Sequence, residues 1–378
     1  MQIKIPFNRP SIEGRELQLI AQAVERGHIS GDGVFTRTAS EMLQELLGAQ
    51  KVLLTTSCTD ALEMSAILLD ISDGDEVIVP AFTFVSGVNA FVLRGAKPVF
   101  ADIDELTLNI SVASIAARLS DRTRIIAPVH YAGVGCDMDA ILALASRSEI
   151  DVVEDNAHGL FGRTRGRALG SFGRLATQSF HETKNINCGE GGALVINDPA
   201  LNERAEIIRE KGTNRSRFFR GLTDKYTWVD IGSSYLPSDI LAAYLVAQLE
   251  ARDAIQRKRR IVWSRYQDAL SDWSAQHGVR LPYVPKDAEQ PYHMFYVILS
   301  SLSERESLRL HLRDRGIVAA FHYIALNTAP MAAKFGAATG DCPVAESISE
   351  RLLRLPFYNS LAEDDQDFVI ESILSWRR

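Results

Sequence analysis

The chain has 378 residues, of which 46% are apolar and 24% are charged, so it can bury a sizeable core. This composition excludes a disordered chain, a collagen-like chain and a coiled coil. The 48 acidic residues outnumber the 41 basic ones and leave a net charge of −7. That balance argues against a general binder of nucleic acids or membrane surfaces.

The cysteine spacing and the hydropathy pattern indicate a cytoplasmic protein. The four cysteines form no C-x-x-C pair, so neither a metal site nor a disulfide framework is expected. No signal peptide is recognisable, and no apolar run approaches the roughly 18–20 residues of a membrane helix. We therefore expect a cytoplasmic protein that has no membrane partner and no nucleic-acid partner.

Short aliphatic runs and helix-length amphipathic segments alternate over the first half of the chain. This alternation predicts an α/β fold with a mostly parallel sheet covered by helices. The predicted strands are Val52–Thr55, Glu76–Val79, Pro98–Ala101, Arg124–Val129, Asp151–Glu154, Ala176–Phe180 and Ala193–Ile196. The predicted helices are Asp60–Leu69, Val85–Leu93, Val112–Leu119, Met138–Ser146 and Leu201–Glu210.

A different pattern follows and predicts a second, smaller domain. The polar, basic and aromatic stretch Gly212–Gly232 reads as a long loop, and Ser238 is the predicted cap of a helix that runs to about Leu270. We expect a large domain over residues 1–250 and a smaller C-terminal α+β domain over residues 251–378. The elements predicted in the second part are His293–Leu299, Glu304–Arg315, Ile317–Tyr323 and Asp364–Trp376.

Lys184 is the first candidate catalytic residue. It follows the strand that ends near Phe180 and precedes the glycine-rich segment Cys188–Gly192. A lysine near the carboxyl end of a strand, beside backbone that a ligand can approach, suits Schiff-base chemistry. For this residue alone, a solvated surface lysine is the simpler interpretation, so other parts of a cofactor site are needed.

Asp155 and His158 end a buried-type strand and supply two such parts. In α/β folds, ligands bind beside the carboxyl ends of the strands. If the ligand is pyridoxal phosphate, a carboxylate is needed against the ring nitrogen. His158 could then reach the phenolic oxygen of that ring. This segment alone leaves open that Asp155 is a helix N-cap.

A hydroxyl-rich turn before a helix predicts a phosphate site. Helix-start N–H groups and hydroxyls bind phosphate without a lysine. The turn holds Ser57, Cys58, Thr59 and Asp60, and Ser179 is a second hydroxyl candidate. Ordinary N-capping by Ser57 or Thr59 remains open. Phe84 follows another strand end and could stack on a flat ring, although a core aromatic is the simpler interpretation.

Taken together, these segments resemble the DegT family of sugar-nucleotide aminotransferases, pyridoxal-phosphate enzymes with the type I aspartate-aminotransferase fold. The resemblance covers nearly the whole chain. Within the family, it is closest to the dTDP-4-amino-4,6-dideoxygalactose transaminases. The matching segments are the turn at Ser57, 80–85, 128–133, 153–158 and 179–185, and for the branch 31–37, 209–216, 218–221, 224–228 and 230–236.

The resemblance implies a role for each candidate residue. Lys184 would bind the cofactor covalently and move protons, Asp155 would pair with the pyridinium, and His158 would lie near O3′. Phe84 would stack on the ring. The phosphate cup would comprise Thr59, the backbone of Asp60, and Ser179. The remaining cofactor-contact candidates in the same turn are Ser57 and Cys58.

Three positions bear on the assignment to a branch. Ser234 stands where many members carry an asparagine that reaches the partner subunit's phosphate. Asn327 stands where the nearest relatives usually carry histidine. Lys184 is present, whereas a dehydratase branch has histidine in its place, so the resemblance favours transamination.

The Gly212–Gly232 loop mixes basic and aromatic residues that could hold a nucleotide diphosphate and stack its base. A solvated loop with charges facing water is about as good an interpretation. The same mixture would suit single-stranded nucleic acid, but the acidic balance opposes that. The candidate substrate-binding residues are Arg215, Arg220, Lys225, Tyr226, His293 and His322.

The resemblance implies a homodimer with active sites at the subunit interface, serving bacterial surface polysaccharide synthesis. L-glutamate would donate its amino group to a dTDP-4-keto-6-deoxy-D-hexose, giving dTDP-4-amino-4,6-dideoxygalactose and 2-oxoglutarate. Two alternatives are a dTDP-3-keto-6-deoxyhexose 3-aminotransferase and a non-catalytic regulator that binds pyridoxal phosphate. The sequence does not resolve which sugar carbon is aminated.

Overall fold

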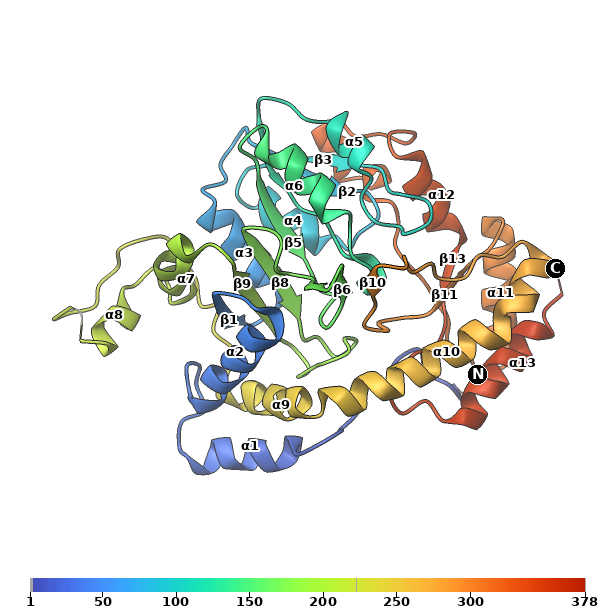
Figure 1. Ribbon diagram of the computed structural model, residues 1–378, viewed down its shortest axis with the longest axis horizontal. Coiled ribbons are helices and arrows are strands. Elements are labelled where there is room, and N and C mark those ends of the chain that lie inside the picture. Colours follow the sequence, from blue (N-terminus) through green and yellow to red (C-terminus); the bar gives the residue numbers. More distant parts are fainter. Residues whose placement is uncertain (1–2, 222, 378) are drawn as a thin grey trace.

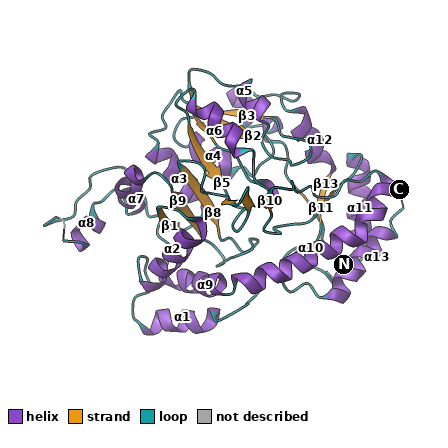
Figure 2. Ribbon diagram, viewed as in Figure 1, coloured by secondary structure: helices purple, strands orange, loops and turns teal. Residues whose placement is uncertain are grey.

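The computed structural model describes residues 3–221 and 223–377, and its centre is a seven-stranded sheet (Figures 1 and 2). The strand order is β1-β9-β8-β5-β4-β2-β3. All seven strands were predicted, each within three residues at either end. Their bounds are β1 (Lys51–Thr55), β2 (Glu76–Pro80), β3 (Lys97–Ala101), β4 (Thr123–Ile126), β5 (Asp151–Asp155), β8 (Leu175–Ser179) and β9 (Gly192–Ile196).

Strand direction determines where the site can lie. The neighbouring pairs β3-β2, β2-β4, β4-β5 and β5-β8 are parallel, and β9 is antiparallel to both β8 and β1. The prediction of a mostly parallel sheet is therefore confirmed. Because β1, β2, β5 and β8 run the same way, the segments that follow them meet at one edge of the sheet.

Alternating burial on the strands explains why helices cover both faces. Leu53 belongs to the core beneath α3, whereas its neighbours Val52 and Leu54 belong to the opposite core, beneath α1, α2 and α9. Successive side chains of a strand point to opposite faces, so a strand that is buried on both sides is apolar throughout. The helices of this part are α1 (Glu16–Glu25), α2 (Val34–Leu47), α3 (Cys58–Leu68), α4 (Ser86–Val92), α5 (Val112–Ala116), α6 (Met138–Ser146) and α7 (Asn202–Arg209).

The long helix predicted after Ser238 is two helices, α9 (Asp239–Glu250) and α10 (Arg252–His277). The predicted cap is confirmed, since the Leu241 N–H donates to Ser238 Oγ at 3.4 Å. Apolar residues surround α9, which is buried on nearly all sides, whereas α10 carries its buried residues on one side only. The two helices run along the lower side of the molecule and end beside the C-terminal elements (Figure 1).

The C-terminal part has its own small antiparallel sheet, in the order β11-β13-β12, and its own apolar cluster around Tyr266, Phe295 and Trp376. The two predicted strands of this part are shorter than expected. Ile5 joins this cluster from the other end of the chain, and a domain boundary at residue 250 stays a prediction. The elements are β11 (Tyr296–Ile298), α11 (Leu302–Asp314), β12 (Ala320–Phe321), α12 (Pro343–Arg351), β13 (Leu352–Arg354) and α13 (Glu363–Leu374).

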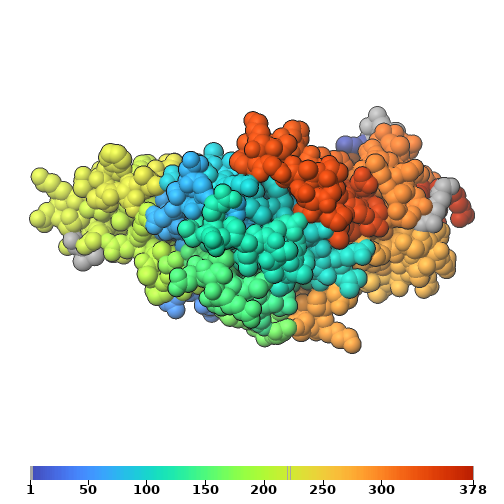
Figure 3. Space-filling view, turned by 90° about the horizontal axis from the view of Figure 1, so that it is seen from above, coloured from blue at the N-terminus to red at the C-terminus, as the bar shows by residue number. Residues whose placement is uncertain are grey.

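Residues 211–221 and 223–232 form a projecting arm, at the left end of Figures 1 and 3. The predicted loop there contains one short helix, α8 (Arg215–Phe219). A second three-stranded sheet lies near the middle of the molecule and comprises β6 (Arg163–Thr164), β7 (Arg167–Ala168) and β10 (Ala288–Glu289). Within the described ranges, no helix has both the length and the apolar character that crossing a bilayer requires.

Candidate active site

A cavity of about 540 Å³ lies where β1, β5 and β8 end. It is closed from the other side by residues of the C-terminal part, among them His293 and Arg354. The structure brings ten of the predicted site residues together here, from segments far apart in the chain. These are Ser57, Cys58, Thr59, Phe84, Asp155, His158, Ser179, Lys184, His293 and His322.

Lys184 lies in the connection between β8 and β9. Its N–H donates to the His181 carbonyl at 2.9 Å, and the Glu182 N–H donates to Gly189 at 2.9 Å, so the turn is tied across its base. The side chain is partly buried, and loss of water lowers the pKa of Lys184 to about 8. An amine with such a pKa is partly neutral, and hence nucleophilic, near neutral pH.

Asp155 ends β5, and its carboxyl group is buried at the cavity wall. Burial raises the pKa of Asp155, while the Ala157 N–H, 3.0 Å from Oδ1, and the charge of Lys184 lower it. The residues after Asp155 form turns rather than an α-helix, so the N-cap alternative does not apply. A carboxylate in this position can accept a hydrogen bond from a protonated ring nitrogen.

The start of α3 forms the opposite end of the cavity. Ser57 is the N-cap, because its Oγ accepts from the Asp60 N–H at 3.0 Å. Thr59 and Ser179 add hydroxyl groups, and the first turn of a helix offers N–H groups to an anion. Asp60 does not line the cavity: its N–H is used by the cap, and its carboxylate accepts from Thr56 Oγ1.

Gly192 allows β9 to approach this helix start. A Cβ atom at position 192 would lie 2.4 Å from the Cys58 nitrogen and 2.3 Å from the Ser57 carbonyl carbon. Only a residue without a side chain fits such a contact without moving backbone. The glycine cluster after Lys184 therefore shapes the end of the cavity at the start of α3.

Three histidines form a stack on one wall of the cavity. The His158 ring lies 4.4 Å from His293 and 6.2 Å from His322, measured between ring centroids. Burial lowers the pKa of all three well below the usual value, so the rings are neutral. The buried Nδ1 atom of His158 has no hydrogen-bond partner among the described residues.

The hydrogen-bond network assigns the tautomer of His293. Asn185 donates from Nδ2 to the Pro291 carbonyl at 2.6 Å, so its Oδ1 is the acceptor facing His293 Nδ1 at 2.7 Å. His293 Nδ1 therefore carries the proton, and Nε2 is left as an acceptor.

Phe84, and not the buried Phe82, is the aromatic that lines the cavity. Its side chain is 58% exposed, and its ring lies 6.0 Å from that of Tyr323. A ring held at the cavity mouth with one face open can stack on a flat ligand.

Tyr323 and Arg354 are among the cavity residues that the sequence did not predict. Tyr323 is the last residue of the predicted strand Ile317–Tyr323 and lies just after β12, and nothing in the local sequence pattern distinguishes it from a core aromatic. Arg354 had a signal, because it is the one charge within the apolar run Leu352–Phe357. A charged side chain that is buried in such a run is expected either to pair with another group of the protein or to bind a ligand.

The other predicted substrate-binding residues, and the predicted cofactor-contact residue Ser234, lie outside the cavity, in or beside the arm. Arg220 pairs with Glu206 at 2.6 Å, and Lys225 and Tyr226 are exposed. Ser234 is exposed and bridges Glu210. Arg215 lies 3.8 Å from Glu210. Roles for these residues stay predictions.

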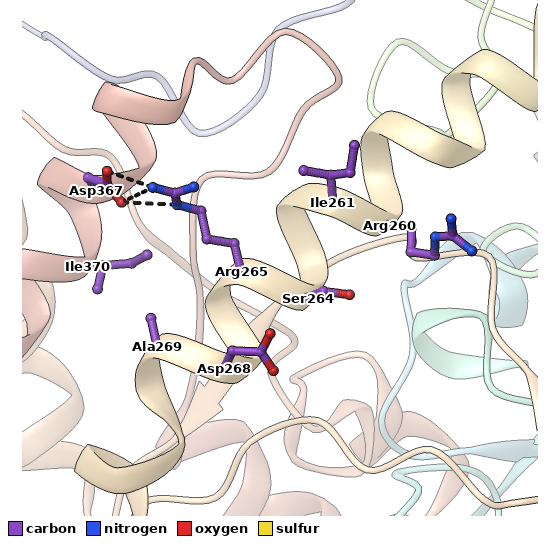
Figure 4. A pocket seen from close by; sticks show the side chains of 8 residues that line it. All are labelled: Arg260, Ile261, Ser264, Arg265, Asp268, Ala269, Asp367 and Ile370. Atoms are coloured by element: carbon purple, nitrogen blue, oxygen red, sulfur yellow. Dashed lines mark hydrogen bonds and ion pairs between the residues drawn. The ribbon is translucent and has the colours of Figure 1, made fainter.

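A second hollow, of about 680 Å³, lies between α10 and α13 (Figure 4). Arg265 and Asp367 in its wall bind each other, with the Nη2 atom 2.7 Å from each carboxylate oxygen. The charges of these two residues are therefore used within the chain, while Arg260 and Asp268 also line the hollow. Within the described ranges, no group of three or more His, Cys, Asp or Glu side chains could hold a metal ion, here or elsewhere.

Comparison with known proteins agrees with this architecture. The spore coat polysaccharide biosynthesis protein SpsC of Bacillus subtilis is 32% identical, over 98% of this chain and 96% of its own. The GDP-perosamine synthase of Escherichia coli O157:H7 is also 32% identical, over 98% of this chain and 97% of its own.

Solved structures of other aminotransferases share the fold. The aminotransferase TlmJ of Streptoalloteichus hindustanus has a TM-score of 0.89 and 30% identity, covering 99% of this chain and 98% of its own. DesV of S. venezuelae, solved with a ketimine intermediate, has a TM-score of 0.89 and 28% identity, covering 100% and 99%. The predicted fold class is thereby confirmed. Residues 10–374 match the profile of the DegT/DnrJ/EryC1/StrS aminotransferase family, and the chain belongs to that family.

Proposed function

We propose that this aminotransferase moves the amino group of L-glutamate to a dTDP-4-keto-6-deoxy-D-hexose. The products would be dTDP-4-amino-4,6-dideoxygalactose and 2-oxoglutarate. The observation that carries the proposal is one cavity in which an amine of lowered pKa, Lys184, faces the buried carboxyl of Asp155 and the start of α3.

Pyridoxal 5′-phosphate is the cofactor, and the cavity residues fit it. Lys184 would bind its aldehyde carbon, Asp155 its ring nitrogen, and Thr59 and Ser179 its phosphate beside α3. The unpartnered, buried Nδ1 atom of His158 supports a polar ligand atom at this wall. Phe84 would cover the open face of the ring. When bound, the cofactor supplies an electron-withdrawing ring that stabilises negative charge on the reacting carbon.

Lys184 would carry the proton transfers. Its pKa of about 8 means that protonated and neutral forms are both populated near neutral pH, which suits a group that acts as acid and base in turn. Asp155 would hold a proton on the ring nitrogen, since the Ala157 N–H and the charge of Lys184 favour its carboxylate form and oppose the effect of burial, which raises the pKa of Asp155.

The arm supports a homodimer whose sites lie at the interface. The arm that carries Arg215, Arg220, Lys225 and Tyr226 extends away from the sheet beside which the cavity lies (Figure 1). They would bind the nucleotide diphosphate in the partner's cavity, and Ser234 would lie near the partner's cofactor phosphate. The similarity to a polysaccharide biosynthesis protein supports a role in supplying an amino sugar to a surface polysaccharide.

The test is the structure of the product. Protein supplied with pyridoxal phosphate, glutamate and dTDP-4-keto-6-deoxyglucose should yield a sugar with the amine at C4 in the galacto configuration, as determined by NMR. An amine at C3, an amine of the opposite configuration, or turnover only with a GDP-linked sugar would each refute the assigned substrate.

A further inference from the structure

We propose that Arg354 binds the carboxylate of the amino donor inside the cofactor cavity. The inference rests on the proposed transamination and deepens it, because it assigns the donor's anionic group to one side chain. Arg354 ends β13 and lines the cavity together with Lys184.

The guanidinium of Arg354 has unused hydrogen-bonding capacity. Nη1 lies 3.3 Å from His322 Nε2, and the guanidinium carbon lies 4.6 Å from the centre of the Phe7 ring. Nε is buried without a hydrogen-bond partner, and no ion pair joins this arginine to a carboxylate of the described residues. A partly buried cation without a counter-charge is costly, so an anion from outside the chain is the natural partner.

Arg259 shows what a structural arginine looks like in the same region. Its Nε donates to the Tyr292 carbonyl at 2.9 Å, Nη1 to Asn359 Oδ1 at 2.9 Å, and Nη2 to the His293 carbonyl at 2.6 Å. All three nitrogens are engaged by the protein. Arg354 differs because its guanidinium keeps N–H groups that can donate to a ligand.

Among the groups that line the cavity wall, Arg354 is the cation that is available to bind an anion. Lys184 and Arg354 are the two Lys or Arg side chains among the described residues that line the cavity, and Lys184 is needed for covalent chemistry. The neighbouring His158, His293 and His322 are neutral. A guanidinium fork matches the two oxygens of a carboxylate.

The position beside Lys184 favours a carboxylate over a diphosphate. The positive charge of Arg354 helps to lower the pKa of Lys184, so the two groups are close. In an amino acid, the α-carboxylate is attached to the reacting carbon and must lie beside Lys184. In a 4-keto sugar, several bonds separate the reacting carbon from the diphosphate.

The experiment compares Arg354→Gln and Arg354→Lys with Arg351→Gln in the cofactor-loaded enzyme. Arg351 lies three residues earlier, bonds the Ser347 carbonyl and is no part of the cavity lining. Two readouts are used: calorimetric binding of glutarate, a dicarboxylate without an amine, and the separate rates of the glutamate and keto-sugar half-reactions. Cofactor absorbance and melting temperature verify that each variant is folded and loaded.

Arg354→Gln should weaken glutarate binding and raise the glutamate concentration at half-maximal rate by about 10- to 100-fold, as expected for a lost bond to a charged group. Arg354→Lys should fall in between, and Arg351→Gln should match the wild type. The keto-sugar half-reaction of the pre-aminated enzyme should change less than about twofold. Unchanged donor binding, or a loss confined to the keto-sugar half-reaction, would overturn the inference. Failure of the wild type on every dTDP-sugar would refute the proposed substrate alone, because the glutamate half-reaction is measured without a sugar.

Discussion

Lys184 combines a partly buried amine with a carboxylate and a thiol nearby. Loss of water lowers the pKa of Lys184 to about 8 and outweighs the charge of Asp155, which would raise it. Desolvation opposes the charged form of any amine, and here it acts on the residue that we propose attacks the carbonyl of the cofactor. Burial of the amine is therefore itself the cause of its reactivity.

The pH dependence of cofactor uptake should reveal this pKa. Because only the neutral amine attacks the aldehyde, the rate at which apoprotein takes up pyridoxal phosphate should rise with pH and level off above about 8. An ordinary lysine would level off near pH 10.4. Stopped-flow absorbance measures the rate. Lys97→Ala, an exposed lysine at the start of β3, is the matched control. A rate that climbs steadily to pH 10 would contradict the burial effect.

At the scale of elements, the strand runs were predictable because their β-branched residues are buried on both faces of the sheet. The break between α9 and α10 at Ala251 was not, because no glycine or proline marks the junction. Arg354 and Tyr323 were missed for a different reason. They join Asp155 and Lys184 only through the docking of β12 and β13, which local patterns do not encode.

The junction between β9 and α3 should tolerate no side chain at position 192. Gly192→Ala would force apart the backbone of β9 and Ser57, lowering the free energy of unfolding by roughly 1–3 kcal/mol. Cofactor affinity should fall as well, because the helix start moves. Denaturant unfolding and a cofactor titration measure the two effects.

Gly14→Ala is the control for this substitution. There the nearest atom, the Ala247 carbonyl oxygen, lies 3.4 Å from the new Cβ, so stability should hardly change. Equal behaviour of the two alanine variants would mean that the close approach at Gly192 does not shape the site.

For the whole molecule, the arm and the cavity lie apart, so a shared site predicts complementation between subunits. A Lys225→Ala/Tyr226→Ala variant and a Lys184→Ala variant should each be weak or inactive alone. Co-expressed, they should form mixed dimers in which one cavity has both an intact lysine and an intact arm. Amination of the sugar should then exceed the sum of the separate activities.

Lys184→Ala co-expressed with Asp155→Ala is the matched control, because both changes affect the cavity itself. Both subunits of that pair have intact arms. The pair can therefore form a cavity with both Lys184 and Asp155 only if these two residues come from different chains. Recovery in the control, or none in the test pair, would contradict the proposed assembly.

The N-terminal segment has a consequence for biosynthesis. The Val318 N–H donates to the Ile5 carbonyl at 3.0 Å, and the Phe357 N–H donates to the Phe7 carbonyl at 3.1 Å. During translation, Ile5 and Phe7 cannot form these hydrogen bonds until their partners, more than three hundred residues later in the chain, have been synthesised. The loop they close is among the last structure to form as the chain leaves the ribosome. A bulky fusion placed ahead of Ile5 would hinder that late closure. Because the Phe7 ring packs against the Arg354 guanidinium, the fusion would also disturb the position of Arg354.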